Sequence, residues 1–175
     1  DLVYNKDDTT PPEISTYFNQ ERGKLIITTN EPAKCAYNES DFEFSQAKSF
    51  SESFVKQQER NWNPSWEGYK IKCRDLFRNE NSINYEGSET EAPKITRIYK
   101  SGDNLKLNTD ISAKCYYSFN DCSFDQQEKQ NNVMSNTFEK THSTTWDSGK
   151  TYYIKCENQW NKMENECTII NLASL

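Results

Sequence analysis

The 175-residue chain has a single histidine and lacks the short patterns that mark most enzymes and metal sites. The Gly-x-Ser-x-Gly pattern of a nucleophile elbow is absent. No Cys-x-x-Cys pair is present, so a zinc site is not predicted. His142 would have to be the base of any Ser-His or Cys-His system, and we expect it to be a surface residue. The chain is therefore predicted not to be an enzyme, with no cofactor and no metal.

Two further absences restrict the partners. The net charge is −6 and no basic stripe is present, so nucleic acid is not an expected partner. No apolar run approaches the roughly 18 residues that a membrane-spanning helix needs, so no membrane span is predicted. Hydrophobic residues make up only 33% of the chain, but aromatic residues make up 13%. Because each aromatic side chain buries about 150–250 Å², a few of them can build a small core.

The chain does contain an internal repeat. Residues 33–37, Ala-Lys-Cys-Ala-Tyr, recur at 113–117 as Ala-Lys-Cys-Tyr-Tyr. Residues 69–73 recur at 152–156. The offset of about 80 residues is the size of one small β-sandwich. The repeat therefore predicts two tandem modules.

The predicted boundaries follow from this repeat. Residues 1–10 belong to neither copy and form a short tail with a β-prone patch. Domain 1 is predicted over residues 11–90 and domain 2 over residues 91–175. We expect short strands and turns throughout, with no long helix.

Several strands can be placed from local patterns. In the strand at 69–73, Tyr69, Ile71 and Cys73 are expected on a buried face, with the lysines on the other. The stretch 49–60 is predicted to be an irregular or helical loop, while Phe42 and Phe44 alternate as in a strand. The other predicted elements are strands at 14–18, 25–29, 34–37 and 168–172 and a turn at 30–32.

The six cysteines occupy positions that the repeat relates to one another. Six cysteines allow 15 pairings, of which the repeat singles out one. The resulting disulfides are Cys35–Cys73, Cys115–Cys156 and Cys122–Cys167. Each closes a loop of roughly 40 residues and is worth about 3–4 kcal/mol in the chain-entropy model. Disulfides predict an oxidising, extracellular or cell-surface location.

Three stretches resemble known modules: residues 30–37, residues 68–75 and Asn79 just beyond them. Trp146 also precedes Tyr152 by the interval of a fibronectin-type tyrosine corner. The chain thus resembles the Ig-like and fibronectin type III-like modules of microbial cell-surface or filament-forming proteins. The resemblance implies an all-β fold of two tandem Ig-like β-sandwich domains. Because Cys35 follows a complete strand, its disulfide is expected to join neighbouring strands of one sheet.

Two functions remain open. The first is an extracellular structural subunit that self-assembles into a pilus-like surface filament or layer, with other copies of itself as partners. Leu2, Val3 and Tyr4 would then add as a donor strand to a neighbouring subunit. The alternative is a cell-surface adhesion or receptor-type module that recognises protein or glycan through loops at 42–61 and 123–143.

A few residues are secondary candidates. Asn38 begins a glycosylation sequon, Asn-Glu-Ser. Acidic residues at 7–8 and 39–43 have the ligand chemistry of a calcium site, but a solvated acidic surface is the preferred interpretation. The four tryptophans (Trp62, Trp66, Trp146 and Trp160) are predicted mainly to fill the cores, with a binding platform as the alternative.

Overall fold

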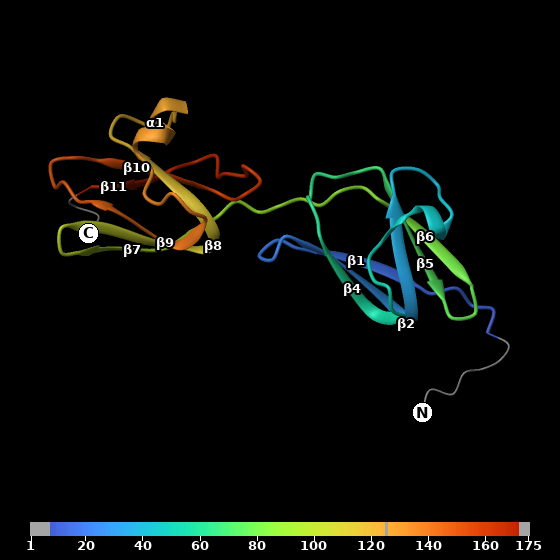
Figure 1. Ribbon diagram of the computed structural model, residues 1–175. Coiled ribbons are helices and arrows are strands. Elements are labelled where there is room, and N and C mark those ends of the chain that lie inside the picture. The colour runs from blue at the N-terminus through green and yellow to red at the C-terminus, as the bar shows by residue number, and fades with distance from the viewer. Residues whose placement is uncertain (1–7, 125, 172–175) are drawn as a thin grey trace. The chain divides into compact units, whose positions relative to one another are not determined.

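The computed structural model describes residues 8–124 and 126–171, with the backbone alone for residues 126–128. The predicted donor residues Leu2, Val3 and Tyr4 lie outside this range. The chain forms two compact units that divide between Glu89 and Thr90, and each consists of antiparallel strands (Figure 1). The all-β prediction is confirmed. In the described part of the chain, no helix is long and apolar enough to cross a membrane.

Unit 1 is organised around one long strand. Its elements are β1 (Ile14–Asn19), β2 (Lys24–Asn38), the 3-10 helix η1 (Phe44–Gln46), β3 (Lys48–Ser49), β4 (Val55–Asn61), β5 (Tyr69–Asp75) and β6 (Glu80–Tyr85). The first half of β2 pairs with β1 and β4, and its second half pairs with β3 and β5. Strand β6 pairs with β5.

Unit 2 repeats this pattern. Its elements are β7 (Ile95–Ser101), β8 (Asn104–Ser118), α1 (Gln126–Asn131), β9 (Glu139–Thr145), β10 (Tyr152–Glu157) and β11 (Thr168–Ile170). The long strand β8 pairs with β7, β9 and β10, and β11 pairs with β10. The sequence repeat therefore reflects a repeat of strand pairing.

The turn predicted at 30–32 is wrong, because β2 continues through it as a bulge. The register with β4 shifts between Thr28 and Ala33, and the matching shift in unit 2 lies between Asn108 and Ala113. The Thr29 hydroxyl donates to the Glu31 carbonyl oxygen at 2.7 Å within the bulge. Proline is tolerated at such a site because it need not donate to the ladder.

The irregular or helical stretch predicted at 49–60 is also wrong in large part. It contains the last residue of β3 and most of β4. Only one residue of β4, Gln58, is buried, so the strand has no apolar alternation to reveal it. Phe42 lies in a loop and Phe44 begins η1, so their predicted strand is absent.

The core of each unit consists of the side chains that its long strand and the neighbouring strands bury. In β5, Ile71 and Cys73 are buried and Tyr69 is half-buried, which confirms the predicted face. Full burial of an aliphatic side chain such as that of Ile71 contributes about 1.5–3 kcal/mol. The fully buried apolar and cysteine residues are Leu25, Ile27, Ala33, Cys35, Ile71 and Cys73 in unit 1 and Leu105, Leu107, Ala113 and Cys115 in unit 2.

The three disulfides join Cys35 to Cys73, Cys115 to Cys156 and Cys122 to Cys167. Cys35 lies directly opposite Cys73 in the β2–β5 ladder, and their Cα atoms are 4.1 Å apart. This bridge therefore joins neighbouring strands, as expected from the sequence. Cys35 lies on the same strand, β2, as the predicted strand at 25–29, because the turn expected between them at 30–32 does not form.

Tyr152 forms the contacts of a tyrosine corner. Its hydroxyl donates to the Thr145 carbonyl oxygen and accepts from the Asp147 amide, both at 2.8 Å. The Trp146 ring stacks on it with centroids 5.2 Å apart. At the matching position in unit 1, the Tyr69 hydroxyl donates instead to Glu39 Oε1 at 3.0 Å. The two units thus share a pairing pattern but differ at this corner.

Candidate functional site

The residues that precede β1 are fixed to unit 1. We call residues 8–13 the N-terminal arm. Asn79 Nδ2 donates to the Asp8 carbonyl oxygen at 3.0 Å, and Asn81 Nδ2 donates to the Pro12 carbonyl oxygen at 3.0 Å. The Glu13 amide donates to Asn30 Oδ1 at 3.0 Å. The arm is therefore held beside β6, and the predicted donor residues come immediately before it in the chain.

The N-terminal arm begins at one end of unit 1. Asp8 is held by the turn between β5 and β6, which the Asp75 amide closes by donating to the Asn79 carbonyl oxygen at 3.1 Å. Strand β6 ends at Tyr85, and from this opposite end the chain continues toward unit 2, which begins at Thr90. A six-residue strand is about 20 Å long. The start of the N-terminal arm and the segment that leads to unit 2 thus lie at opposite ends of this strand.

The turn depends on the buried carboxylate of Asp75, which is 1% exposed. Its Oδ1 accepts from the amides of Phe77 at 2.7 Å and Asn79 at 2.8 Å. Its Oδ2 accepts from Asn79 Nδ2 at 2.8 Å. Asp75 and Asn79 were singled out by the resemblance, and their role here is to shape the turn that holds the N-terminal arm.

Unit 2 builds the same turn with an amide. Asn158 Oδ1 accepts from the Trp160 and Lys162 amides at 2.9 and 3.0 Å. Asn158 Nδ2 donates directly to the Glu91 carbonyl oxygen at 2.9 Å, so this unit also fixes the segment that leads into it.

Three carboxylates gather near the start of the N-terminal arm. One oxygen from each of Asp8, Glu31 and Asp75 lies within 4.8 Å of the others. Burial, and then the charges of Asp8 and Asp75, raise the pKa of Glu31 above its usual value, while Lys56 opposes the shift. Both Asp75 oxygens already accept protein hydrogen bonds, and we assign no ion to the cluster.

Replacing Glu31 with glutamine removes a partly desolvated charge and its repulsion by Asp8 and Asp75. We expect it to stabilise unit 1 at pH 7 by only about a few tenths of a kcal/mol, since solvent screens these charges. The pKa of Glu31 is higher in the folded than in the unfolded protein. The wild-type protein therefore loses stability as the pH rises from the unfolded pKa to the folded one. Urea unfolding between pH 4 and 7 should show a smaller loss in Glu31→Gln. The control is Glu52→Gln, in an exposed loop. A destabilised Glu31→Gln would mean that the carboxylate makes a net favourable interaction.

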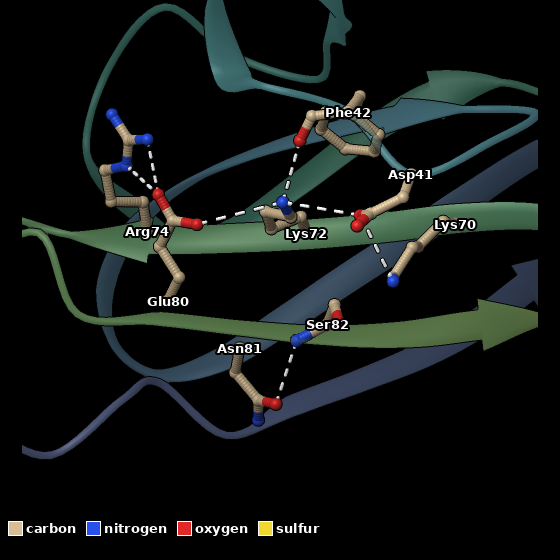
Figure 2. A network of polar contacts seen from close by, with 8 residues as sticks. All are labelled: Asp41, Phe42, Lys70, Lys72, Arg74, Glu80, Asn81 and Ser82. Carbon is tan, nitrogen blue, oxygen red and sulfur yellow. Dashed lines mark hydrogen bonds and ion pairs between the residues drawn. The ribbon is translucent and has the colours of Figure 1, made fainter.

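A ladder of cations covers the outer face of β5 (Figure 2). Lys72 Nζ donates to the Phe42 carbonyl oxygen at 2.7 Å and lies 3.6 Å from Asp41 Oδ1. Lys70 Nζ approaches the same Asp41 oxygen at 3.1 Å. The Lys70 hydrogen bond and the two lysine charges hold the pKa of Asp41 below its usual value. These contacts attach the loop after β2 to the sheet.

The ladder continues through two aromatic rings. Lys72 Nζ lies 5.0 Å from the ring centroid of Phe42, and the Arg74 guanidinium lies 4.4 Å from that of Phe44. Arg74 also forms an ion pair with Glu80. Cation–π contacts of this kind contribute about 0.5–1 kcal/mol at exposed sites. The first part of the recognition loop predicted at 42–61 is therefore tied down by β5.

The corresponding face of unit 2 holds α1. Glu157 accepts from the Tyr116 hydroxyl at 2.6 Å and from Lys129 Nζ at 2.8 Å. Burial and the Glu157 hydrogen bond raise the pKa of Tyr116. The region predicted as an irregular loop at 123–143 thus contains α1 and the start of β9.

Aromatic side chains cluster at the end of unit 1 where β5 begins and β6 ends. Trp62 is 4% exposed and contacts several of the rings, which agrees with a core role. Trp66 is 41% exposed and lies against Trp62 with centroids 5.2 Å apart. The cluster consists of Tyr37, Phe50, Trp62, Trp66, Tyr69 and Tyr85. Trp66 is thus the tryptophan of this cluster with a ring available for recognition.

The predicted surface position of His142 is wrong. It is 1% exposed and lies on β9 opposite Leu107, whose side chain is in the core of unit 2. Burial lowers its pKa, which favours the neutral ring. A base so enclosed has no access to a substrate in solution.

Asn38 is the last residue of β2, and its Oδ1 accepts from the Glu39 amide at 2.9 Å. It is half-buried, and Ser40, the third residue of the sequon, is exposed. Glycosylation of Asn38 stays a prediction.

No protein-family model matches the chain, and no curated protein does. Among solved structures, one described as "Cytokine receptor complex - Crystal form 1A" aligns with 93% of this chain and 100% of its own chain. Its TM-score is 0.39 and the sequence identity is 7%, values that do not establish a shared fold. The sheets establish an all-β protein, whereas the Ig-like arrangement stays a prediction.

Proposed function

We propose that this protein is an extracellular structural subunit that self-assembles head to tail into a surface filament or layer. The N-terminal arm supplies the observation that carries the proposal. It is fixed at one end of β6, and the chain leaves for unit 2 from the other end. Contacts between unlike ends are heterologous, and they extend an open chain of subunits wherever the rotation between copies does not close a ring. Three disulfides fit a secreted or extracellular protein.

Leu2, Val3 and Tyr4 provide the joint in this proposal. The seven residues before Asp8 span about 23 Å when extended, enough for one ordinary strand. Strand addition obtains affinity from main-chain hydrogen bonds and specificity from alternate side chains. Because the N-terminal arm is held by its own unit, the donor strand would start from a fixed point and reach a neighbouring copy.

Replacing Leu2, Val3 and Tyr4 together with serine is expected to abolish assembly. Negative-stain electron microscopy of the non-reduced protein at micromolar concentration should show filaments or sheets for the wild type and dispersed particles for the variant. This variant keeps the Asp8 carbonyl that Asn79 binds, whereas deletion of residues 1–10 would also remove this anchor.

The matched control replaces Asn5, Lys6 and Asp7 with serine and should still assemble. Normal assembly of the Leu2/Val3/Tyr4 variant would show that strand addition by these residues is wrong. A wild-type protein that stays monomeric at all concentrations tested would rule out the structural function itself.

The exposed ring of Trp66 favours a second candidate function, recognition of protein or glycan at the cell surface. The Asn63 side chain shapes the preceding turn by accepting from the Ser65 amide at 3.1 Å, so the ring is presented from a defined turn. Binding to a glycan array that is lost in Trp66→Ala, with unfolding unchanged, would support this function. No binding by the wild-type protein would count against glycan recognition.

A further inference from the structure

The two units place different polar residues at one buried position. Gln58 lies opposite Ile27 in the β2–β4 ladder, and His142 lies opposite Leu107 in the β8–β9 ladder. Both are buried, with exposed fractions of 3% and 1%. Directly opposite residues project from the same face of a sheet, so both side chains project into the core of their unit.

In unit 1, the amide of Gln58 satisfies the main chain beyond the β2 bulge. Gln58 Nε2 donates to the Ala33 carbonyl oxygen at 2.9 Å, and its Oε1 accepts from the Cys35 amide at 3.1 Å. Nε2 also lies 3.2 Å from Cys35 Sγ, one sulfur of the buried disulfide. Gln58 thus joins β4 to the bulge and to the disulfide without carrying a charge.

In unit 2, the imidazole of His142 has no such contacts. Neither Nδ1 nor Nε2 has a hydrogen-bond partner among the residues that the structure describes. The main chain of Glu139 approaches the ring without completing a hydrogen bond, and its carboxylate favours the charged form. Burial acts in the opposite direction and is the larger effect, so it lowers the pKa of His142.

The surroundings offer little to stabilise an imidazolium. Across the described part of unit 2, Glu139 on the same strand is the charged group that acts on the ring. Among the described residues that form the buried hydrophobic cluster of unit 2, Tyr152 of β10 is the one with an ionisable side chain. Its hydroxyl already forms hydrogen bonds with Thr145 and Asp147. The buried core residues of β8, β10, β11 and the α1–β9 loop are Leu105, Leu107, Ala113, Cys115, Tyr152, Ile154, Cys156, Ile170 and Met134.

We propose that His142 makes unit 2 an acid-opened module, in which protonation of the ring separates β9 from the core and exposes the Cys115–Cys156 disulfide. Unit 1 stays closed because Gln58 does not titrate. The sign follows from linkage: an open state with a free histidine binds a proton that the closed state excludes, so acid favours opening. The device belongs to the single chain and does not depend on assembly.

The expected size follows from the unfolded histidine pKa of about 6.5. Below that value the open fraction rises about tenfold per pH unit until the closed state also binds the proton. Between pH 7.5 and pH 5.0 the increase therefore reaches at most about thirtyfold. Glu139 has a pKa below the usual carboxylate range and stays ionised across this interval.

The test measures how fast each disulfide of the intact chain is reduced. A pulse of a water-soluble phosphine at pH 7.5 or 5.0 is followed by alkylation of the new thiols and peptide mapping. The Cys35–Cys73 disulfide of the same molecule serves as the reference. Dividing the reduction rate of Cys115–Cys156 by that of Cys35–Cys73 cancels the pH dependence of the reductant. This ratio is expected to rise at least fivefold on acidification, up to the thirtyfold limit.

Two reciprocal variants decide the assignment. His142→Gln installs the residue that unit 1 uses and should leave the ratio nearly independent of pH. Gln58→His should transfer the acid sensitivity to Cys35–Cys73. A wild-type ratio that does not change with pH would overturn the proposal, as would an undiminished acid response in His142→Gln.

Discussion

Replacement of Cys35 and Cys73 with alanine is expected to lower the free energy of unfolding of unit 1 by about 5 kcal/mol. The disulfide spans a sequence separation of 38, for which loop closure alone accounts for about 4 kcal/mol. Both cysteines are fully buried, so removing the sulfur atoms also leaves a cavity. A unit of this size has only about 4–12 kcal/mol to lose. Urea unfolding, monitored through hydrogen exchange of the β2 and β5 peptides, would measure the loss of unfolding free energy.

The same replacement at Cys122 and Cys167 is expected to cost about 3 kcal/mol or less. This bridge joins partly exposed residues and leaves a smaller cavity. The Cys115–Cys156 disulfide already closes most of the same loop, so the added restriction of the unfolded chain is smaller. Equal losses for the two double variants would mean that burial of the sulfur atoms contributes little.

Replacement of Asp75 with alanine is expected to cost unit 1 about 3–4 kcal/mol. It leaves the amides of Phe77 and Asn79 without their acceptor and frees the Asn79 side chain. Hydrogen bonds to a charged group contribute about 1.5–3 kcal/mol each, and their effects overlap here. Because Asn79 also binds Asp8, hydrogen exchange of the N-terminal arm should accelerate together with that of the turn.

Asp75→Asn is the matched control, because Asn158 supports the corresponding turn in unit 2. It keeps an oxygen that can accept from the two turn amides, and we expect a loss of about 1 kcal/mol. It also removes a charge that raises the pKa of Glu31. Equal losses in the alanine and asparagine variants would show that the negative charge, more than the turn geometry, stabilises this site.

The repeat was a reliable guide to the core. Cys35 and Cys115 occupy matching places in the two long strands, as do Ala33 and Ala113. These side chains are completely buried, and a close-packed interior accepts few alternatives at such positions. The alternation in β5 was also legible, because one of its faces is consistently more buried than the other.

Features that depend on distant partners could not be predicted in this way. Asn30 and Pro32 have the composition of a turn, but the pairing of β2 with β4 and β5 keeps the chain extended through a bulge. Strand β4 is mostly polar because a single residue, Gln58, enters the core. His142 shares that position, but the spacing of the repeats differs here, and a polar side chain gives no local sign of burial.

The disulfides also limit how far the chain can lengthen when its two ends are pulled. A stretched polypeptide gains at most about 3.3–3.6 Å per residue. The Cys35–Cys73 bridge carries tension directly across a separation of 38 residues, so the loop it closes cannot be drawn out while the bond is intact. That withholds about 130 Å of extension from unit 1. The two overlapping bridges of unit 2 shorten its path in the same way. An oxidised chain under tension thus has a short tether even when its strands have separated, and reduction alone would release the remaining length.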